Sequence, residues 1–237
     1  PGAILENVIM NSEGEVDFED VSITQNTRVS YPIYHINNIQ TPSVGENTKN
    51  IFFLTADAFG VLPPISKLTP GQAAYHFISG YTAKVAGTEE GITEPVPSFS
   101  ACFGAPFMPL HPTKYAEMLS EKMKASGVNV WLVNTGWTGG PYGTGSRMKL
   151  KYTRAMISAA LEGKLDHVEF EQHPIFGLEM PKECPNVPAE VLCPRDTWQD
   201  QEAYDKKANL LATYFKDNFE KFDDYANDEI LKGGPIV

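Results

Sequence analysis

The hydrophobic positions of this chain form two kinds of pattern, short apolar runs and stripes with helical spacing. Residues 51–54 form an apolar run that predicts a parallel strand buried on both faces, and residues 128–134 predict a second buried strand. A helical stripe begins at Thr69–Pro70, an N-cap and N1 pair, and runs through Lys84, and another spans residues 112–127. These alternating strands and helices predict a mixed α/β fold.

The two ends of the chain have other patterns. Residues 4–34 contain strand-like runs separated by acidic turns and predict an antiparallel ribbon, and residues 40–50 form a polar connector. We expect an ordered loop at 87–109, irregular proline-punctuated structure at 164–195 and a long last helix at 198–222. The side chains expected to face the core from the helices are Ala74, Phe77, Ile78 and Tyr81; Tyr115, Met118, Leu119 and Met123; Met156, Ile157, Ala160 and Leu161; and Leu210, Leu211, Tyr214, Phe215, Phe219 and Phe222.

A glycine-rich loop joins the second predicted strand to a basic helix start. Strand, glycine loop and basic helix start is the order in which proteins hold phosphates, because helix N-terminal amides and cationic side chains converge there. The spacing of Gly140 and Gly145 matches a phosphate loop, but Ser146 and Arg147 stand where that motif needs lysine and a hydroxyl residue. An ordinary surface turn with a solvated basic face is an equally weighted alternative. The residues concerned are Gly136, Gly139, Gly140, Gly143 and Gly145, followed by Arg147, Lys149, Lys151 and Arg154.

Two single residues are further candidates. Asp57 follows the first strand, and in α/β sheets ligands bind beyond the carboxyl ends of such strands. A carboxylate that caps backbone amides in a turn is the commoner alternative for Asp57. Arg28 lies on a predicted strand, where it is either a paired edge residue or a bidentate ligand for an anion.

Composition narrows the range of functions. The formal net charge of −11 argues against nucleic-acid or anionic-membrane partners and leaves the basic loop suited to a small anion. The three cysteines show neither a disulfide framework nor zinc-ligand spacing, so we expect reduced thiols in a cytoplasmic protein. No histidine motif for a metal and no GxSxG elbow for a hydrolase is present in the sequence. Because the chain starts with Pro1, we expect it to begin within a longer protein.

Four segments carry a resemblance to a known family. They are Asn-Thr-Arg-Val-Ser-Tyr-Pro at 26–32, the run from Phe53 to Pro64, Phe-Ser-Ala-Cys-Phe-Gly-Ala at 99–105, and Asn-Thr-Gly-Trp at 134–137. In this order they resemble the C-terminal part of ATP-dependent phosphoenolpyruvate carboxykinase. The resemblance implies a carboxy-lyase of gluconeogenesis that converts oxaloacetate and ATP to phosphoenolpyruvate, ADP and CO2.

The resemblance also implies roles for individual residues. Arg28 would contact the substrate and the terminal phosphate of ATP, and would act in catalysis. Arg147, Met148 and Thr153 would line the nucleotide pocket. The chain departs from the family at Ser146, which replaces a lysine, and in the extra residues around Gly140–Gly143.

Other parts of the family's site have no counterpart in this sequence. By resemblance, residues 1–237 are the C-terminal portion of the nucleotide-binding domain, and the phosphate loop and the ligands for Mg2+ and Mn2+ lie upstream. We therefore expect the chain alone to be inactive, to need the N-terminal part of the same enzyme as a partner, and to leave some apolar edges uncovered. The alternative is a non-catalytic scaffold or a weak adenine-nucleotide binding module.

Overall fold

The computed structural model describes residues 2–24, 26–84 and 94–236, which divide into two compact units. The first unit comprises Pro1–Asn47 and Lys84–Val96, and the second comprises Thr48–Ala83 and Pro97–Val237. No helix in the described ranges is both long enough and apolar enough to cross a membrane.

The first unit is built from short antiparallel strand pairs. β1 (Ile4–Glu6) pairs with β4 (Arg28–Ser30), and β2 (Ile9–Met10) pairs with β3 (Val16–Asp17). The Asn11 side chain accepts hydrogen bonds from the Glu13 and Glu15 amides and closes the turn between β2 and β3. A 3₁₀ turn, η1 (Ile33–His35), follows β4. The predicted antiparallel ribbon is confirmed, with shorter strands than the sequence pattern indicated.

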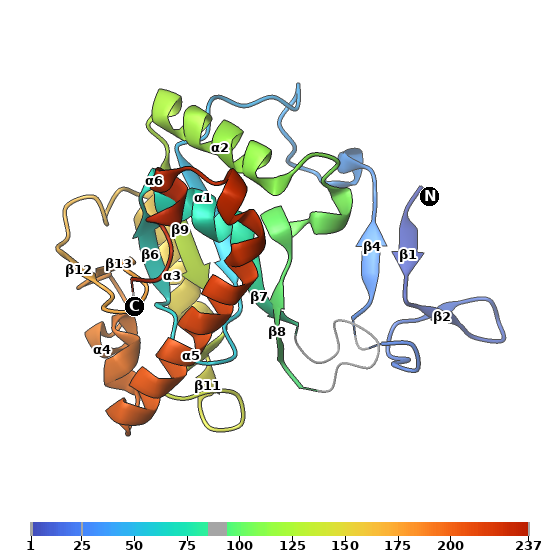
Figure 1. The fold of residues 1–237 in the computed structure, drawn as a ribbon. Coiled ribbons are helices and arrows are strands. Elements are labelled where there is room, and N and C mark those ends of the chain that lie inside the picture. Colours follow the sequence, from blue (N-terminus) through green and yellow to red (C-terminus); the bar gives the residue numbers. More distant parts are fainter. Residues whose placement is uncertain (1, 25, 85–93, 237) are drawn as a thin grey trace. The chain divides into compact units, whose positions relative to one another are not determined.

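A five-stranded mixed sheet forms the centre of the second unit (Figure 1). Its order is β12 (Phe170–Gln172), β13 (Glu179–Pro181), β6 (Ile65–Leu68), β9 (Asn129–Asn134) and β5 (Asn50–Thr55). β5 and β9 are parallel, while all other neighbours in the sheet are antiparallel. The mixed α/β fold and the parallel direction of β5 are therefore confirmed.

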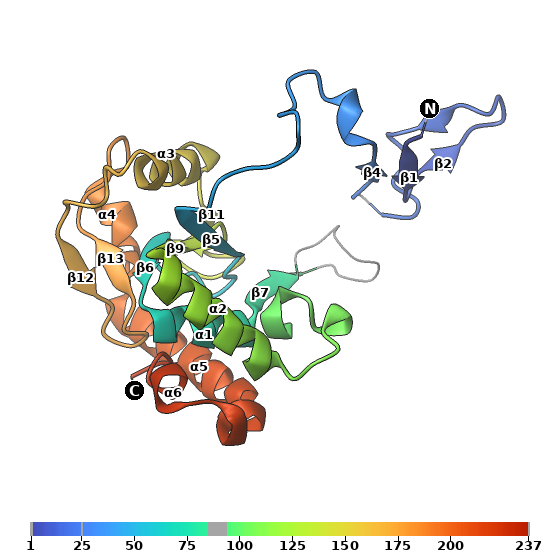
Figure 2. The same ribbon diagram turned by 90° about the horizontal axis from the view of Figure 1, so that it is seen from above.

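Helices cover both faces of this sheet (Figure 2). α1 (Pro70–Ser79), α2 (Pro112–Ser126), α5 (Gln201–Phe219) and α6 (Asp228–Leu231) lie on one side, and α3 (Leu150–Leu161) lies on the other. The remaining elements are β7 (Tyr81–Lys84) paired with β8 (Val96–Phe99), β10 (Trp137–Thr138) paired with β11 (Ser146–Arg147), α4 (Ala189–Leu192), and the 3₁₀ helices η2 (Ala101–Phe103), η3 (Ala105–Phe107), η4 (Pro194–Thr197) and η5 (Glu220–Tyr225).

The alternation of side chains along β9 separates two cores. Val130 and Leu132 belong to the core under α1, α2 and α5, whereas Trp131 and Val133 belong to the core under α3. Because both faces are buried, the strand reads as a continuous apolar run rather than as an alternating pattern. The prediction of a buried strand at 128–134 is thus confirmed.

The predicted helix from Thr69 is right at its start and wrong at its end. Thr69 and Gln72 form a reciprocal capping box at the N-terminus of α1. The helix ends at Gly80, which has φ +54° and whose position leaves no room for a Cβ beside the Ser100 carbonyl. Tyr81 consequently begins β7 instead of extending a helical face to Lys84.

Three further expectations from the pattern are corrected. β5 lies at one edge of the sheet, and its Leu54 side chain is 58% exposed, so the strand is not buried on both faces. The open edge and the exposed leucine agree with the expectation of uncovered apolar surface. The segment 164–195 contains β12, β13 and α4 rather than only irregular structure, because its strands are too short to show a period. Part of the loop expected at 87–109 lies outside the described residues, and the rest holds β8, η2 and η3.

Most of the expected core positions are buried or half-buried, but four are not. Met118, Leu161, Leu210 and Tyr214 are exposed. On α2 the buried residues are Thr113, Ala116 and Met123, and the small Ala116 allows the close approach of α1. Spacing alone cannot distinguish this neighbouring stripe from the predicted one, since both repeat every three to four residues.

A buried histidine ties together three segments of the second unit. The His173 Nδ1 accepts hydrogen bonds from the Ile175 and Phe176 amides, and Nε2 lies 2.7 Å from the Tyr204 hydroxyl. That hydroxyl donates to the Val61 carbonyl at 2.9 Å. The two amides require an unprotonated Nδ1, so His173 is neutral with its proton on Nε2. Burial lowers the pKa of His173 to about 4.

This shift predicts an acid-labile fold. Between the ordinary pKa of 6.5 and about 4, the unfolded chain binds a proton at this position that the folded chain does not bind. Acidification across this range should therefore lower the free energy of unfolding, by up to roughly 3 kcal/mol from this residue. Urea unfolding of His173→Gln should show a weaker dependence on pH between 7 and 5 than the unmutated protein. His167→Gln, at an exposed position, is the control and should keep the full dependence. An unchanged dependence in His173→Gln would contradict the prediction.

Candidate functional site

The parallel strands β5 and β9 end at the same edge of the sheet, and the segments that follow them pack together. The Thr135 amide donates to the Thr55 carbonyl at 2.8 Å, and the Trp137 amide donates to the Asp57 carbonyl at 2.8 Å. The Tyr142 amide donates to the Ala58 carbonyl at 2.9 Å. The region that sequence analysis selected around the glycine-rich loop thus rests directly on the segment that contains Asp57.

Asp57 is buried and serves the backbone. Its carboxylate accepts hydrogen bonds from the amides of Phe59, Val61 and Leu62 and from the Tyr81 hydroxyl, at 2.8–2.9 Å. Burial raises the pKa of this carboxyl, and the four donors oppose the rise. With no exposed surface, Asp57 cannot touch a ligand in this conformation. The turn-capping interpretation is supported over that of a ligand-binding residue.

The Asn134 amide holds the two segments in register. Its Oδ1 accepts from the Asp57 and Gly136 amides at 3.0 and 2.8 Å, and its Nδ2 donates to the Leu62 carbonyl at 2.9 Å. Asn134 is fully buried, so water cannot reach its amide group and its hydrogen bonds must come from the protein. The end of β9 and the segment after β5 are therefore one rigid polar assembly.

The glycine-rich loop is a β-hairpin and does not lead straight into the helix. β10 and β11 pair antiparallel, with Trp137 opposite Arg147 and Thr138 opposite Ser146. A Cβ on Gly136 would overlap the backbone of Asp57, and one on Gly145 would overlap the Gly140 carbonyl. The close approaches that these glycines allow are therefore to the protein's own backbone. This explains Gly136 and Gly145 without a bound phosphate.

Three of the predicted nucleotide-binding residues lie in the last strand of the hairpin or directly after it. Arg147 is exposed, whereas Met148 and Thr153 are each 7% exposed. The Met148 amide donates to the Gly136 carbonyl at 2.7 Å, which fixes the backbone directly after Arg147. Thr153 lies in the first turn of α3, whose N-cap residue Lys149 makes no side-chain cap. The structure thus brings Arg147, Met148 and the start of α3 into one continuous segment.

Arg28 is described within the first unit. It lies opposite Glu6 in the β1–β4 pair, and its Nη1 is 3.8 Å from Glu6 Oε2. Both side chains are more than half exposed, so this ion pair contributes little to stability. The guanidinium consequently remains accessible to an anionic ligand.

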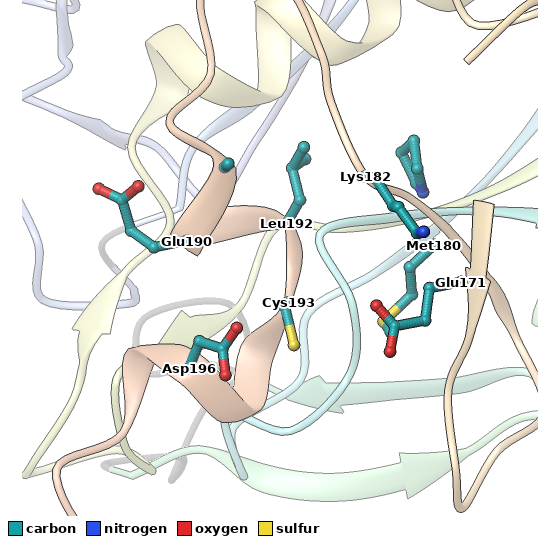
Figure 3. A pocket seen from close by; sticks show the side chains of 9 residues that line it. Glu171, Met180, Lys182, Glu190, Leu192, Cys193 and Asp196 are labelled. Carbon is teal, nitrogen blue, oxygen red and sulfur yellow. The ribbon is translucent and has the colours of Figure 1, made fainter. Parts of the chain in front are cut away.

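A separate pocket of about 360 Å³ lies between the β12–β13 strands and the α4–η4 segment (Figure 3). Its wall includes Glu171, Lys182 and Asp196, together with the thiol of Cys193. Burial raises the pKa of Cys193, which keeps the thiol protonated and weakly nucleophilic at neutral pH. None of the predicted site residues lines this pocket.

The described residues offer no metal centre. Within residues 2–24, 26–84 and 94–236, no three His, Cys, Asp or Glu side chains are placed to hold a metal ion together. Cys102, Cys184 and Cys193 are free thiols.

Sequence analysis missed the aromatic residues of the hairpin. Trp137 and Tyr142 pack edge to face, with ring centroids 5.5 Å apart, and the Arg147 guanidinium lies over the Trp137 ring. The signal was the Asn-Thr-Gly-Trp segment at 134–137, which was noted only for its resemblance. The pairing of Trp137 with Arg147 depends on the hairpin register, which the sequence did not reveal.

Comparisons with known proteins agree on one family. A family model described as phosphoenolpyruvate carboxykinase matches residues 1–190. The chain is 78% identical over 236 residues to phosphoenolpyruvate carboxykinase (ATP) of Christiangramia forsetii and 73% identical over 237 residues to that of Flavobacterium johnsoniae. It is 58% identical over 238 residues to the protein of the same name from Geobacillus thermodenitrificans. Each alignment covers all of this chain but only 44–45% of the relative, so the chain spans less than half the length of these relatives.

Proposed function

Because the chain belongs to the ATP-dependent phosphoenolpyruvate carboxykinase family, we propose that the full-length protein containing it converts oxaloacetate and ATP to phosphoenolpyruvate, ADP and CO2. The observation that carries this proposal is the 78% and 73% identity over the whole chain to proteins of that name. The reaction is a decarboxylation followed by phosphoryl transfer to the enolate, as in gluconeogenesis. The free thiols support a cytoplasmic location for the protein.

In this proposal the chain supplies part of the site. Arg28 contacts the substrate and the terminal phosphate of ATP, where its planar guanidinium can bridge two anionic oxygens during transfer. Arg147, Met148 and Thr153 hold the nucleotide. The exposure of Arg28 and Arg147 supports these roles, since neither guanidinium is enclosed by the protein.

The rest of the site belongs to a part of the protein outside this chain. Residues 1–237 form the C-terminal portion of the nucleotide-binding domain, and the N-terminal part carries the phosphate loop and the ligands for Mg2+ and Mn2+. This division is supported by the share of its relatives' length that the chain spans, which is 44–45%. The outer edge of β5 also pairs with no described strand and is open to a further strand. By itself the chain is proposed to be inactive.

The proposal is tested by assaying the full-length protein with oxaloacetate, ATP and a divalent cation. Phosphoenolpyruvate and ADP should form in equal amounts, because one phosphoryl group is transferred in each turnover. Phosphoenolpyruvate itself must be measured, since decarboxylation without transfer would also release CO2. A reaction without ATP is the control and should give no phosphoenolpyruvate. Release of CO2 without phosphoenolpyruvate, with ATP present, would exclude the proposed reaction.

A further inference from the structure

The Arg147 side chain is held in place by contacts on two sides. Its Nε donates a hydrogen bond of 2.6 Å to the Thr135 carbonyl, which lies between β9 and β10. Its Cζ lies 5.0 Å from the centroid of the Trp137 ring, within the range of a cation–π interaction. The structure records no hydrogen bond or ion pair between the terminal Nη1 and Nη2 groups and any described residue. The side chain is therefore oriented while four of its five N–H donors remain available.

The Trp137 ring has a second neighbour, the aromatic ring of Tyr142. The Tyr142 ring meets it edge to face at an interplanar angle of 85°. The hairpin that carries both rings is anchored through the bond from the Trp137 amide to the Asp57 carbonyl and through the bond from the Tyr142 amide to the Ala58 carbonyl. Tyr142, Trp137 and Arg147 thus form a row of side-chain contacts on a hairpin that is anchored to the rigid polar assembly around Asp57.

These contacts reduce the conformational entropy that the Arg147 side chain loses when it binds a ligand. A free arginine side chain loses rotamer entropy when a ligand fixes it. Arg147 has already been fixed by the Thr135 carbonyl and the indole, so binding has less entropy left to remove. Contacts that only stabilised the hairpin would not require Nη1 and Nη2 of Arg147 to stay free.

We infer that Trp137 is a positioning residue for nucleotide binding: its ring, supported by Tyr142, holds the Arg147 guanidinium so that Nη1 and Nη2 face an anionic group of the bound nucleotide. The inference rests on the proposed role of Arg147. It adds two residues, Trp137 and Tyr142, to which neither the motifs nor the family resemblance gave a role.

The test uses the full-length protein with ATP as the probe, and measures the dissociation constant by calorimetry together with kcat and both KM values. Trp137→Leu should raise the Kd and KM for ATP by roughly 3- to 30-fold, with a smaller change in kcat and no change in the KM for oxaloacetate. Trp137→Phe should restore most of the affinity, because it keeps an aromatic face. Tyr142→Ala, at an exposed position, should give a smaller loss with the fold intact. Phe107→Leu removes an exposed aromatic ring elsewhere and should change nothing.

A double-mutant cycle separates positioning from stability. In the Arg147→Gln background, Trp137→Leu should cause no further loss of ATP affinity if the ring acts through the guanidinium. The inference is wrong if Trp137→Leu lowers ATP affinity equally in both backgrounds. It is also wrong if Trp137→Leu and Tyr142→Ala both leave ATP affinity unchanged. Either result leaves the proposed function in place. If Arg147→Gln binds ATP normally, both the role of Arg147 and the inference are wrong. A full-length protein that forms no phosphoenolpyruvate, yet shows the expected losses in ATP affinity, would overturn the proposed function and support the inference.

Discussion

Arg28→Gln in the full-length protein is expected to lower kcat by roughly 10²- to 10³-fold with little change in stability. The physical reason for the first effect is that a guanidinium beside the transferred phosphoryl group stabilises charge that develops in the transition state. The second effect follows from the surroundings of Arg28: its side chain is exposed, and its ion pair with Glu6 is long, at 3.8 Å. Steady-state kinetics and thermal unfolding of the same preparation measure both quantities.

Glu6→Gln is the matched control for this experiment. If Arg28 is only one half of a strand-edge ion pair, removing either partner should have the same effect. If Arg28 acts in phosphoryl transfer, Glu6→Gln should leave turnover close to normal, because the arginine remains. Similar kcat values for Arg28→Gln and Glu6→Gln would return Arg28 to the structural interpretation.

Thr153→Val gives a useful contrast. It removes one neutral hydroxyl from the first turn of α3, and a neutral hydrogen bond contributes roughly 0.5–1.5 kcal/mol. We therefore expect a weaker affinity for ATP, by about 2- to 12-fold, with turnover largely kept. An Arg28→Gln variant that raised only the KM for ATP, with turnover unchanged, would show that the catalytic role given to Arg28 is wrong.

Asp57→Ala is expected to destabilise the protein more than any other single change considered above, by about 3–5 kcal/mol. The carboxylate is fully buried and accepts four hydrogen bonds, from three backbone amides and the Tyr81 hydroxyl. Alanine leaves all four donors buried without a partner and opens a cavity at the end of β5. Thermal or urea unfolding measures the loss, with an expected fall in Tm of roughly 10 °C.

Asp20→Ala is the matched control, because Asp20 also caps a backbone amide, that of Ser22, but at an exposed turn. Water can replace an exposed carboxylate, so this change should cost less than about 0.5 kcal/mol. The loss of stability in Asp57→Asn should lie between those of Asp57→Ala and Asp20→Ala. The asparagine oxygen can still accept hydrogen bonds, but its NH2 group would face N–H or O–H donors that now bond to the carboxylate. Equal stability of Asp57→Ala and Asp20→Ala would contradict the role we assign to the Asp57 carboxylate.

Features that depend on neighbouring residues could be predicted from the order of amino acids alone. The apolar run of adjacent side chains predicted β9, because a strand buried on both faces needs such a run. Thr69 predicted the start of α1, because its side chain accepts a hydrogen bond from a backbone amide only three residues away. The family resemblance rested on contiguous segments in the same way, and the comparisons confirmed it.

Features that depend on distant residues became visible only in the folded chain. β6 is inserted antiparallel between β13 and β9, and the short strands β12 and β13 gain their stability from this pairing rather than from any local period. Asp57 became a buried cap because Tyr81 and Asn134 approach it from 24 and 77 residues away. Trp137 and Arg147 lie opposite each other because of the register of the hairpin. The hairpin can pack this closely because Gly136 and Gly145 leave room for neighbouring backbone. Burial and pairing of this kind are set by which surfaces meet across the fold, and a pattern read along a single stretch of chain does not contain that information.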